Sequence, residues 1–404
     1  MIPAAGPPAH NQYLRVAGAM FAVGWGANQF APMLSVYRQV DHLSQPVVTA
    51  MFAAYVGGLV PALLAAGWWS QHRGKRPFVR LAVVLSLVAS VLLAWGADHL
   101  WLLYLGRLVA GAAAGVVMGP GTGWVKELSG DRPTGTGARR ATIALSAGFG
   151  GGPLVAGVLA QWAPWPQVLP YLVHVVVVAA AGVAVWTAPE LDRGDHPTPT
   201  FAAVVDVLRT RWFTRRVMPT APWVFGVATT GFVILPAAVR EVTGEYGVLA
   251  IALSAGLVLG TGVLVQPRVR AFEDAHPGRT LPTAMTITAL GLLLGIVTTW
   301  TQWLWLLPVC TIVLGTSYGM TLVGGLRTIE THVPVHLLAP VSAVYYCLTY
   351  LGFFIPLVAA LVSTVVSVPV ALAFGLVSAL LVVPVVLSEP GHGSGLSSDV
   401  SGAA

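Results

Sequence analysis

The scarcity of charged side chains is the sequence feature that most constrains this fold. Asp, Glu, Lys and Arg make up only 9% of the 404 residues, against about 25% in a typical soluble domain. Such a chain cannot cover a globular surface with charge, so we expect lipid to solvate it. Apolar stretches of about 20 residues, the length of helix that crosses a bilayer, recur from one end of the chain to the other.

Twelve of these apolar runs predict twelve transmembrane helices. Lipid accepts only helices or closed barrels, and the runs are continuously apolar instead of alternating, which favours helices. Most connections are short, so no separate soluble domain is expected between the runs. The predicted fold class is an all-α integral membrane protein. The runs cover residues 15–37, 46–69, 78–97, 101–125, 141–162, 166–187, 217–239, 246–265, 281–300, 303–326, 333–362 and 364–387.

The positions of the cations predict the orientation. With the N-terminus in the cytoplasm, 18 of the 21 Lys and Arg residues fall in inner segments, and Arg38 and Arg240 are the two in outer loops. The remaining cation, Arg107, lies inside an apolar run. By the positive-inside rule, this split places both termini in the cytoplasm and requires an even number of spans. The net charge of +6 is thus a topology signal, and we expect no nucleic-acid partner.

The two halves of the chain repeat each other weakly at a constant offset of 204 residues. Six helices followed by six related helices is the plan of a carrier whose halves rock about a site at mid-membrane depth. We therefore expect two pseudo-symmetric six-helix bundles. The repeat relates Trp-Leu-Leu at 101–103 to 305–307, Gly111 to Gly315, Gly115 to Gly319 and Pro32 to Pro236. The predicted segments are a cytoplasmic tail at 1–14, bundles at 15–187 and 217–388, a cytoplasmic linker at 188–216 and a disordered tail at 389–404.

A polar stretch between the second and third runs reads Gly67-Trp-Trp-Ser-Gln71-His72-Arg73-Gly74-Lys75-Arg76. It resembles the signature Gly-x-x-x-Asp-Arg-x-Gly-Arg/Lys-Arg/Lys of the major facilitator superfamily of transporters, with Gln71 in place of the acid and His72 in place of the next cation. The resemblance implies a latch between the two halves, formed by Gly67, Gln71, Gly74, Lys75 and Arg76. From the residue types, we expect Gly67 to allow close helix approach, Gly74 to allow a tight reversal, and the cations to pair with Glu127 or Asp131. A plain topogenic turn is the alternative.

Arg107 is followed by Gly111 and Gly115, which resembles a second signature of this family, in its fourth helix. A cation inside the membrane costs at least about 2.5 kcal/mol on insertion scales, so an intramembrane Arg is a functional candidate. Asn28 and Gln29 lie at a similar depth in the first run. We predict that Arg107 donates to Gln29 or Asn28 and faces a central cavity, with snorkelling to the surface as the alternative.

A third resemblance lies in the fifth run, which carries Gly148, Gly152, Pro153 and Gly157 in the order of the family pattern Gly-x-x-x-Gly-Pro-x-x-Gly-Gly, with Ala156 for the penultimate glycine. In the family, this pattern is associated with proton-coupled exporters, so the resemblance implies export. Pro153 can bend the helix, and we expect the glycines to let it pack against its counterpart in the other half.

The resemblance implies a central cavity that is lined chiefly by helices 1, 4, 7 and 10, with help from helices 2, 5, 8 and 11. An aromatic and amide wall with one cation suits a medium-sized, partly aromatic, neutral or anionic molecule, although each aromatic side chain could equally serve packing. The predicted lining residues are Trp25, Asn28, Gln29, Arg107, Thr229, Thr230, Tyr318 and Tyr345.

A proton-carrying residue is harder to find, because no Asp or Glu lies well inside a run. His174 is the His well within a span and can titrate near neutral pH. Asp41 and Glu241, near the outer ends of the first and seventh runs, are further candidates for proton exchange.

Together these features predict a secondary transporter that moves a small organic molecule by alternating access, with proton-coupled efflux as the first hypothesis. A uniporter or importer without proton coupling is the alternative, and a membrane enzyme acting on a lipid-linked substrate is a remote one. Arg outnumbers Lys 19 to 2, which suggests a GC-rich genome, and we expect a bacterial inner membrane. We predict a monomer that contacts lipid, its substrate and protons, with no cofactor and no metal, since Cys310 and Cys347 both lie in apolar runs.

Overall fold

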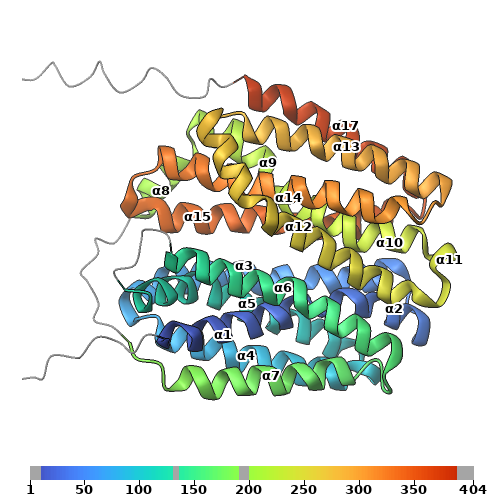
Figure 1. Cartoon of the computed structure of the whole chain (residues 1–404), viewed down its shortest axis with the longest axis horizontal. Coiled ribbons are helices and arrows are strands. Elements are labelled where there is room, and N and C mark those ends of the chain that lie inside the picture. The colour runs from blue at the N-terminus through green and yellow to red at the C-terminus, as the bar shows by residue number, and fades with distance from the viewer. Residues whose placement is uncertain (1–10, 131–135, 191–199, 389–404) are drawn as a thin grey trace, which may run out of the picture.

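The computed structural model describes residues 11–130, 136–190 and 200–388, and these segments form helices joined by turns (Figure 1). The predicted all-α membrane fold is confirmed for this part of the chain. Residues 1–10 of the predicted N-terminal tail, the predicted C-terminal tail, Asp131 and the middle of the linker lie outside the described residues, as does the side chain of Gln71. The first helix already begins at Gln12, within the predicted N-terminal tail. The boundaries predicted for the separate segments remain predictions.

The N-terminal half forms one bundle, which is the lower one in Figure 1. Its helices are α1 (Gln12–Asn28), α2 (Phe30–Val40), α3 (Gln45–Arg73), α4 (Arg76–Trp95), α5 (Leu100–Leu128), α6 (Thr136–Trp162) and α7 (Leu169–Trp186), with a short turn η1 (Gly96–Asp98) before α5. Within this bundle, α5 packs on α3 and α4, and α1 packs on α6.

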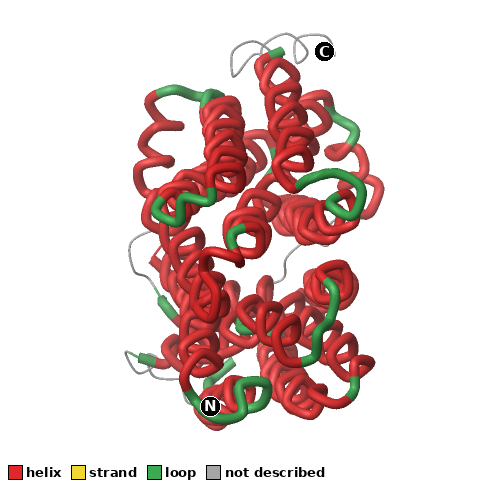
Figure 2. Tube along the Cα trace, turned by 90° about the vertical axis from the view of Figure 1, so that its right-hand side faces the viewer, coloured by secondary structure: helices red, strands yellow, loops and turns green. Residues whose placement is uncertain are grey.

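The C-terminal half forms the second bundle, preceded by the short helix α8 (Phe201–Leu208). Its pieces are η2 (Phe213–Val217), α9 (Met218–Thr229), η3 (Thr230–Ile234), α10 (Leu235–Ala238), α11 (Arg240–Thr243), η4 (Gly244–Tyr246), α12 (Gly247–Ala275), α13 (Thr280–Thr301), α14 (Leu306–His332), α15 (Val335–Tyr350), η5 (Leu351–Phe354), α16 (Ile355–Val362) and α17 (Val368–Leu387). Here α14 packs on α12 and α13, as α5 packs on α3 and α4 in the first bundle. The view along the helices in Figure 2 shows the two bundles one above the other.

Among the described residues, 11 helical segments are long and apolar enough to cross a membrane. The expected first span is α1 followed by α2, and each part is too short to count because the helix is interrupted at Gln29. Pro32 explains the interruption, since it has no N–H to donate to the carbonyl of Asn28 four residues earlier, and its ring crowds that carbonyl.

The second bundle repeats this irregularity at the equivalent place. Pro236 follows η3, a π-helical turn over Thr230–Ile234, so the seventh span changes its hydrogen-bond pattern just before its own proline. In both spans, a proline interrupts the regular helical hydrogen bonds. Neighbouring parts of the protein must then provide partners for the backbone groups that lose theirs.

Glycines at equivalent positions of the two halves allow equivalent helices to touch. A Cβ on Gly111 would meet the carbonyl of Tyr55, and a Cβ on Gly115 that of Leu59, so both glycines of α5 pack against the backbone of α3. A Cβ on Gly315 would lie 2.6 Å from the carbonyl of Val258, and one on Gly319 would meet that of Gly262, which places α14 against α12 in the same way. The repeat in the sequence therefore marks a repeated backbone contact.

The molecule has two ends, which we name by the chain. At the terminal face, α1 begins and α17 ends; at the opposite face, α2 ends and α12 begins (Figure 1). Exposed tryptophans gather at the helix ends of the opposite face, as expected for a membrane interface. They are Trp95, Trp101, Trp162, Trp165, Trp300, Trp303 and Trp305.

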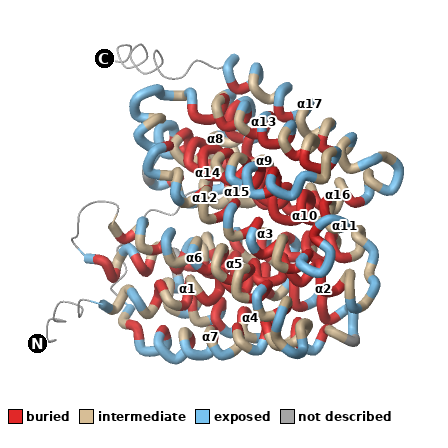
Figure 3. Tube along the Cα trace, turned by 45° about the vertical axis from the view of Figure 1, so that its right-hand side comes forward, coloured by how far each residue is buried: buried red, intermediate tan, exposed pale blue. Residues whose placement is uncertain are grey.

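Burial is greatest between the bundles and least on their outer sides (Figure 3). The seventh span, Phe213–Ala238, has 78% of its most apolar window buried, whereas α17 has 17%. At the opposite face, Gln161 on α6 joins the bundles by donating to the carbonyl of Glu245 at 2.9 Å and accepting from the backbone N–H of Leu249 at 3.3 Å. A further hydrogen bond between the bundles runs from Tyr350 to the sulfur of Met118. The described residues thus form a conformation in which the bundles meet at the opposite face.

We expect Gly111→Ala to destabilise the protein, because the added methyl would force α5 away from the carbonyl of Tyr55. Overpacking of this kind costs about 1 to 3 kcal/mol. Gly119→Ala is the matched control, since a Cβ there meets no described atom within 4 Å and gains up to about 1 kcal/mol of helix propensity. Thermal unfolding in detergent should show a lower midpoint for Gly111→Ala and an equal or higher one for Gly119→Ala. Equal midpoints for the two variants would refute the close contact.

Candidate functional site

Arg107 is completely buried in α5, with 0% of its side chain exposed. Its guanidinium donates to two backbone carbonyls, that of Ala27 at 2.9 Å and that of Phe52 at 3.3 Å. It also lies over the rings of Phe30 and Tyr55, with centroid distances of 4.7 Å and 4.6 Å. A cation is thereby held inside the membrane by carbonyl oxygens and aromatic faces instead of by a carboxylate.

The partners expected for Arg107 were wrong. Asn28 donates to the carbonyl of Phe149 at 3.4 Å, and Gln29 donates to Ser90 at 3.1 Å. Arg107 donates to the carbonyl one residue before Asn28, next to the interruption of the helix at Gln29 that Pro32 explains. The snorkelling alternative is also wrong, because the side chain is fully buried.

The aromatic side chains beside Arg107 continue into the other bundle. Phe52 and Tyr55 of α3 stack on Phe353 of η5, at centroid distances of 5.0 Å and 5.5 Å. Phe353 in turn contacts Tyr350 at 5.4 Å and Phe225 at 5.1 Å. We call Phe52, Tyr55, Phe225, Phe232, Tyr350 and Phe353 the aromatic cluster; each is buried, and together they join α3 to the seventh and eleventh spans.

The aromatic cluster is the part of the site that sequence reasoning missed. Its members are ordinary apolar residues spread over more than 300 positions of the chain, and no motif relates them. A usable signal is that Phe52 and Tyr55 lie three residues apart on α3, and therefore on one helix face, at the depth of Arg107.

The predicted lining residues are all buried in this conformation. Thr229 and Thr230 donate to the carbonyl of Gly226 of their own helix, at 3.2 Å and 2.8 Å. Tyr345 donates to the carbonyl of Thr321 at 3.0 Å, and Tyr318 packs on Phe225 at 5.7 Å. The exposed fraction of the eight residues does not exceed the 9% of Trp25, so they do not share an open surface here. Their contact with a substrate remains a prediction.

His174 belongs to a hydrogen-bonded chain inside the first bundle. Its Nε2 lies 2.8 Å from the carbonyl of Ala22, which can only accept, so Nε2 carries the proton. Its Nδ1 lies 2.7 Å from the hydroxyl of Ser90, which accepts in turn from Gln29. Both ring nitrogens of His174 are thus used to join α7, α4 and the broken first span.

The two candidate carboxylates at the opposite face have different surroundings. Asp41 accepts a hydrogen bond from Gln167 at 2.6 Å, which ties the end of α2 to the turn before α7. Glu241 is exposed and lines a hollow at the end of the second bundle. Neither carboxylate reaches Arg107, and a proton role for either remains a prediction.

The motif between α3 and α4 makes its described contacts within the first bundle. Lys75 forms an ion pair with Glu127 on α5, as expected. The backbone N–H groups of Lys75 and Arg76 donate to the carboxylate of Glu190 at 3.1 Å and 3.4 Å, and Arg76 donates to the carbonyl of Trp186 at 3.2 Å. These bonds gather the terminal-face ends of α4, α5 and α7.

The two glycines of this motif differ in role. Gly74 has a φ of 84°, a left-handed conformation that favours glycine and lets the chain reverse between α3 and α4. A Cβ built on Gly67 would meet no described atom within 4 Å, and close helix approach at Gly67 remains a prediction.

The glycines of the fifth-helix motif divide between two partners. A Cβ on Gly148 would meet the carbonyl of Phe21, and one on Gly152 would lie 2.6 Å from that of Trp25, so both seat α6 on α1 of the same bundle. Gly157 faces Ala252 on α12 of the other bundle. The predicted packing against the other half is therefore right for Gly157 and wrong for Gly148 and Gly152.

We expect Arg107→Ala to lower stability strongly. The variant removes two hydrogen bonds made by a charged donor, worth about 1.5 to 3 kcal/mol each, and the aromatic contacts. Together these losses exceed the about 2.5 kcal/mol recovered by no longer burying a cation. Arg327→Ala is the control, because its ion pair with Asp274 is exposed and worth at most about 1 kcal/mol. A thermal midpoint for Arg107→Ala as high as that of Arg327→Ala would contradict the structural role.

Comparison with solved structures shows which known folds this architecture is similar to. The structure of the nucleoside transporter NupG in a mutant form has a TM-score of 0.74 at 10% identity, covering 94% of this chain and 99% of that chain. A D-xylose–proton symporter has a TM-score of 0.68 at 14% identity, covering 92% and 96%. A POT family transporter in complex with 5-aminolevulinic acid has a TM-score of 0.74 at 9% identity, covering 95% of both chains. At these identities the likeness concerns the fold.

Sequence comparison gives the family. A search of curated proteins finds no match for this chain. The family model of the Major Facilitator Superfamily, in contrast, matches residues 16–356, which include the first bundle, most of the second bundle and the whole aromatic cluster. The chain therefore belongs to the Major Facilitator Superfamily and is a multi-pass membrane transporter.

Proposed function

We propose that this protein exports a small organic molecule across a bacterial inner membrane by alternating access, with the terminal face in the cytoplasm. The observation that carries the proposal is the aromatic cluster. It joins two separately packed bundles through ring contacts that rigid rotation of one bundle can break and remake. We call the surface where the two bundles meet the seam. A rocking-bundle cycle requires a seam whose contacts can break and form again.

The orientation rests on charge. Sixteen described Lys and Arg residues lie at or near the terminal face, whereas the opposite face has Arg38 and Arg240. Cytoplasmic loops are the cation-rich ones. In this orientation the described conformation is closed toward the outside.

The direction of transport rests on the fifth-helix motif. Gly148, Gly152 and Pro153 seat α6 on α1, and Gly157 brings α6 against α12 across the seam. The family pattern that these residues resemble is associated with exporters. Import by the same fold is the competing direction, and one similar structure is that of a symporter by its name.

The driving force separates two candidates. Proton antiport is the first hypothesis from the motif, and it needs a group that takes up and releases a proton along the pathway. In the described spans, the carboxylates lie at helix ends, and His174 has both ring nitrogens occupied inside one bundle. These surroundings favour the second candidate, export down the electrochemical gradient of the solute itself.

Counterflow in proteoliposomes tests transport and coupling together. A thermal-shift screen of small organic solutes selects the ligand, and its labelled form is then followed into preloaded vesicles with and without an imposed pH gradient. We expect exchange that depends on the protein and an initial rate that the pH gradient leaves unchanged. A rate that follows the pH gradient would establish proton coupling, and no exchange with any stabilising solute would overturn the transport proposal.

His174→Gln should leave the pH dependence of this transport unchanged. The glutamine amide offers one donor and one acceptor, which can serve Ala22 and Ser90 in place of the imidazole. Protein stability is measured in parallel, so that a folding defect is recognised. A shifted pH profile in a stable variant would assign the proton to His174.

A further inference from the structure

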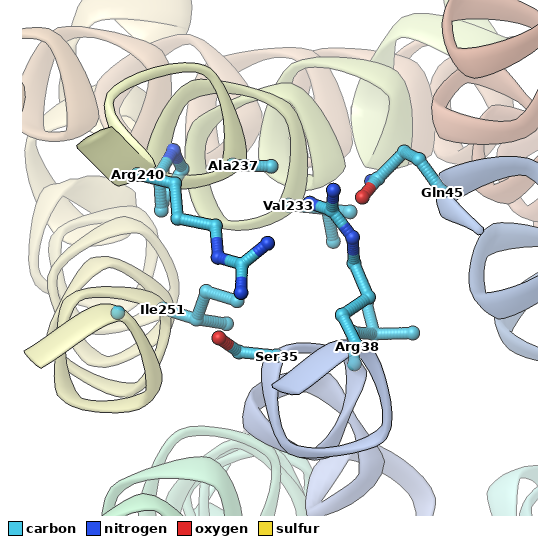
Figure 4. Close-up of a pocket in the computed structure, with 10 residues that line it drawn as sticks. Ser35, Arg38, Gln45, Val233, Ala237, Arg240 and Ile251 are labelled. Carbon is cyan, nitrogen blue, oxygen red and sulfur yellow. The ribbon is translucent and has the colours of Figure 1, made fainter. Parts of the chain in front are cut away.

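The two cations of the opposite face lie across the seam from each other. Arg38 comes from α2 of the first bundle, and Arg240 begins α11 of the second. Figure 4 shows both side chains extending into one pocket between the bundles, with Ser35 and Gln45 also at its wall. Equivalent ends of the first and seventh spans thus bring two positive charges to the same place.

Neither arginine has an acidic partner among the described residues. Asp41, three positions after Arg38, is engaged by Gln167. Glu241 follows Arg240 and lines the adjacent hollow, yet it forms no ion pair with either guanidinium within the described part of the chain. Two half-buried like charges that face each other across a movable seam repel each other, and an anion between them would remove that repulsion.

Two spaces of very different volume have Arg38 and Arg240 in their walls. Between Arg38, Arg240 and the helix walls the pocket is about 10 Å³, room for a single water molecule. Arg38 and Arg240 also line an open hollow of about 350 Å³, together with Glu241 and Gln302. The two arginines therefore border both a narrow pocket between the bundles and a wider, open hollow.

We propose that Arg38 and Arg240 bind one small oxyanion, a carboxylate or a phosphate group, and that this anion favours the conformation closed at the opposite face. Guanidinium groups recognise both oxyanions through paired N–H donors. A ligand held by both bundles binds more tightly when they are close together, so it shifts the equilibrium toward closure. The proposed site controls closure of the bundles at the opposite face, and this role does not depend on the direction of transport.

The test measures the distance between the bundles by electron paramagnetic resonance. His99→Cys and Thr364→Cys place spin labels at exposed positions of the two bundles at the opposite face, after Cys310 and Cys347 are replaced by Ala. In lipid-free detergent, inorganic phosphate at millimolar concentration should increase the fraction with the shorter distance and raise the thermal midpoint. Acetate should act in the same direction.

Variants assign the effect to the two arginines. Arg38→Gln and Arg240→Gln should each weaken the response to phosphate at least tenfold, whereas Arg209→Gln, on exposed chain at the terminal face, should respond like the parent. Arg38→Lys should keep part of the response, since it retains the charge without the paired donors. A response unchanged in both Gln variants, or no response to any anion, would overturn the proposal.

A second arm identifies the source of the oxyanion. In nanodiscs of neutral phosphatidylcholine, a response to added phosphate supports a free solute. A closed state that appears in phosphatidylglycerol nanodiscs without added anion, and is lost in the Gln variants, assigns the site to a lipid phosphate. Closure by phosphatidylglycerol that persists in the Gln variants would count against the site.

Discussion

Every polar group that enters the bilayer must find its partner inside the protein, and this requirement organises the centre of the structure. Pro32 interrupts the hydrogen-bond ladder of the first span near Ala27, and Arg107 places a cation at the same depth. Each is unfavourable alone, but together they form a hydrogen bond between Arg107 and Ala27, supported by Phe30 and Tyr55. The interrupted first span thus provides the carbonyl to which Arg107 of α5 binds.

The internal repeat includes the proline that interrupts the first and seventh spans, but it does not include the buried arginine. Pro236 disturbs the seventh span as Pro32 disturbs the first, and the glycines of α5 and α14 make matching contacts. At the offset of 204, however, Arg107 corresponds to Thr311, whose hydroxyl donates to the carbonyl of Pro308 in its own helix. The bundles therefore share a backbone and differ in chemistry, and the Arg107 cation supports the α3 face of the aromatic cluster from one side only.

Polar contacts within a bundle differ in kind from the contacts between the bundles. Lys75, Arg76 and His174 bind groups of their own bundle, which makes that bundle a rigid unit. The contacts that cross the seam include aromatic stacking, small-residue packing at Gly157, the bonds of Gln161 to backbone groups and the hydrogen bond from Tyr350 to the sulfur of Met118. Contacts of this second kind are many and individually weak, so they can exchange as the bundles rock.

The sequence by itself determined the helical membrane fold, the repeat and the tight turn at Gly74, and it limited the acidic partner of Lys75 or Arg76 to Glu127 or Asp131. These features depend on composition, on local backbone geometry or on charges at neighbouring helix ends, all of which can be read along the chain. Tertiary structure alone decided that Arg107 binds carbonyls and rings, that Gly148 packs within its own bundle, and that Arg38 meets Arg240. Each of these depends on the rotation of one helix against another, which packing sets and a helical sequence pattern leaves free.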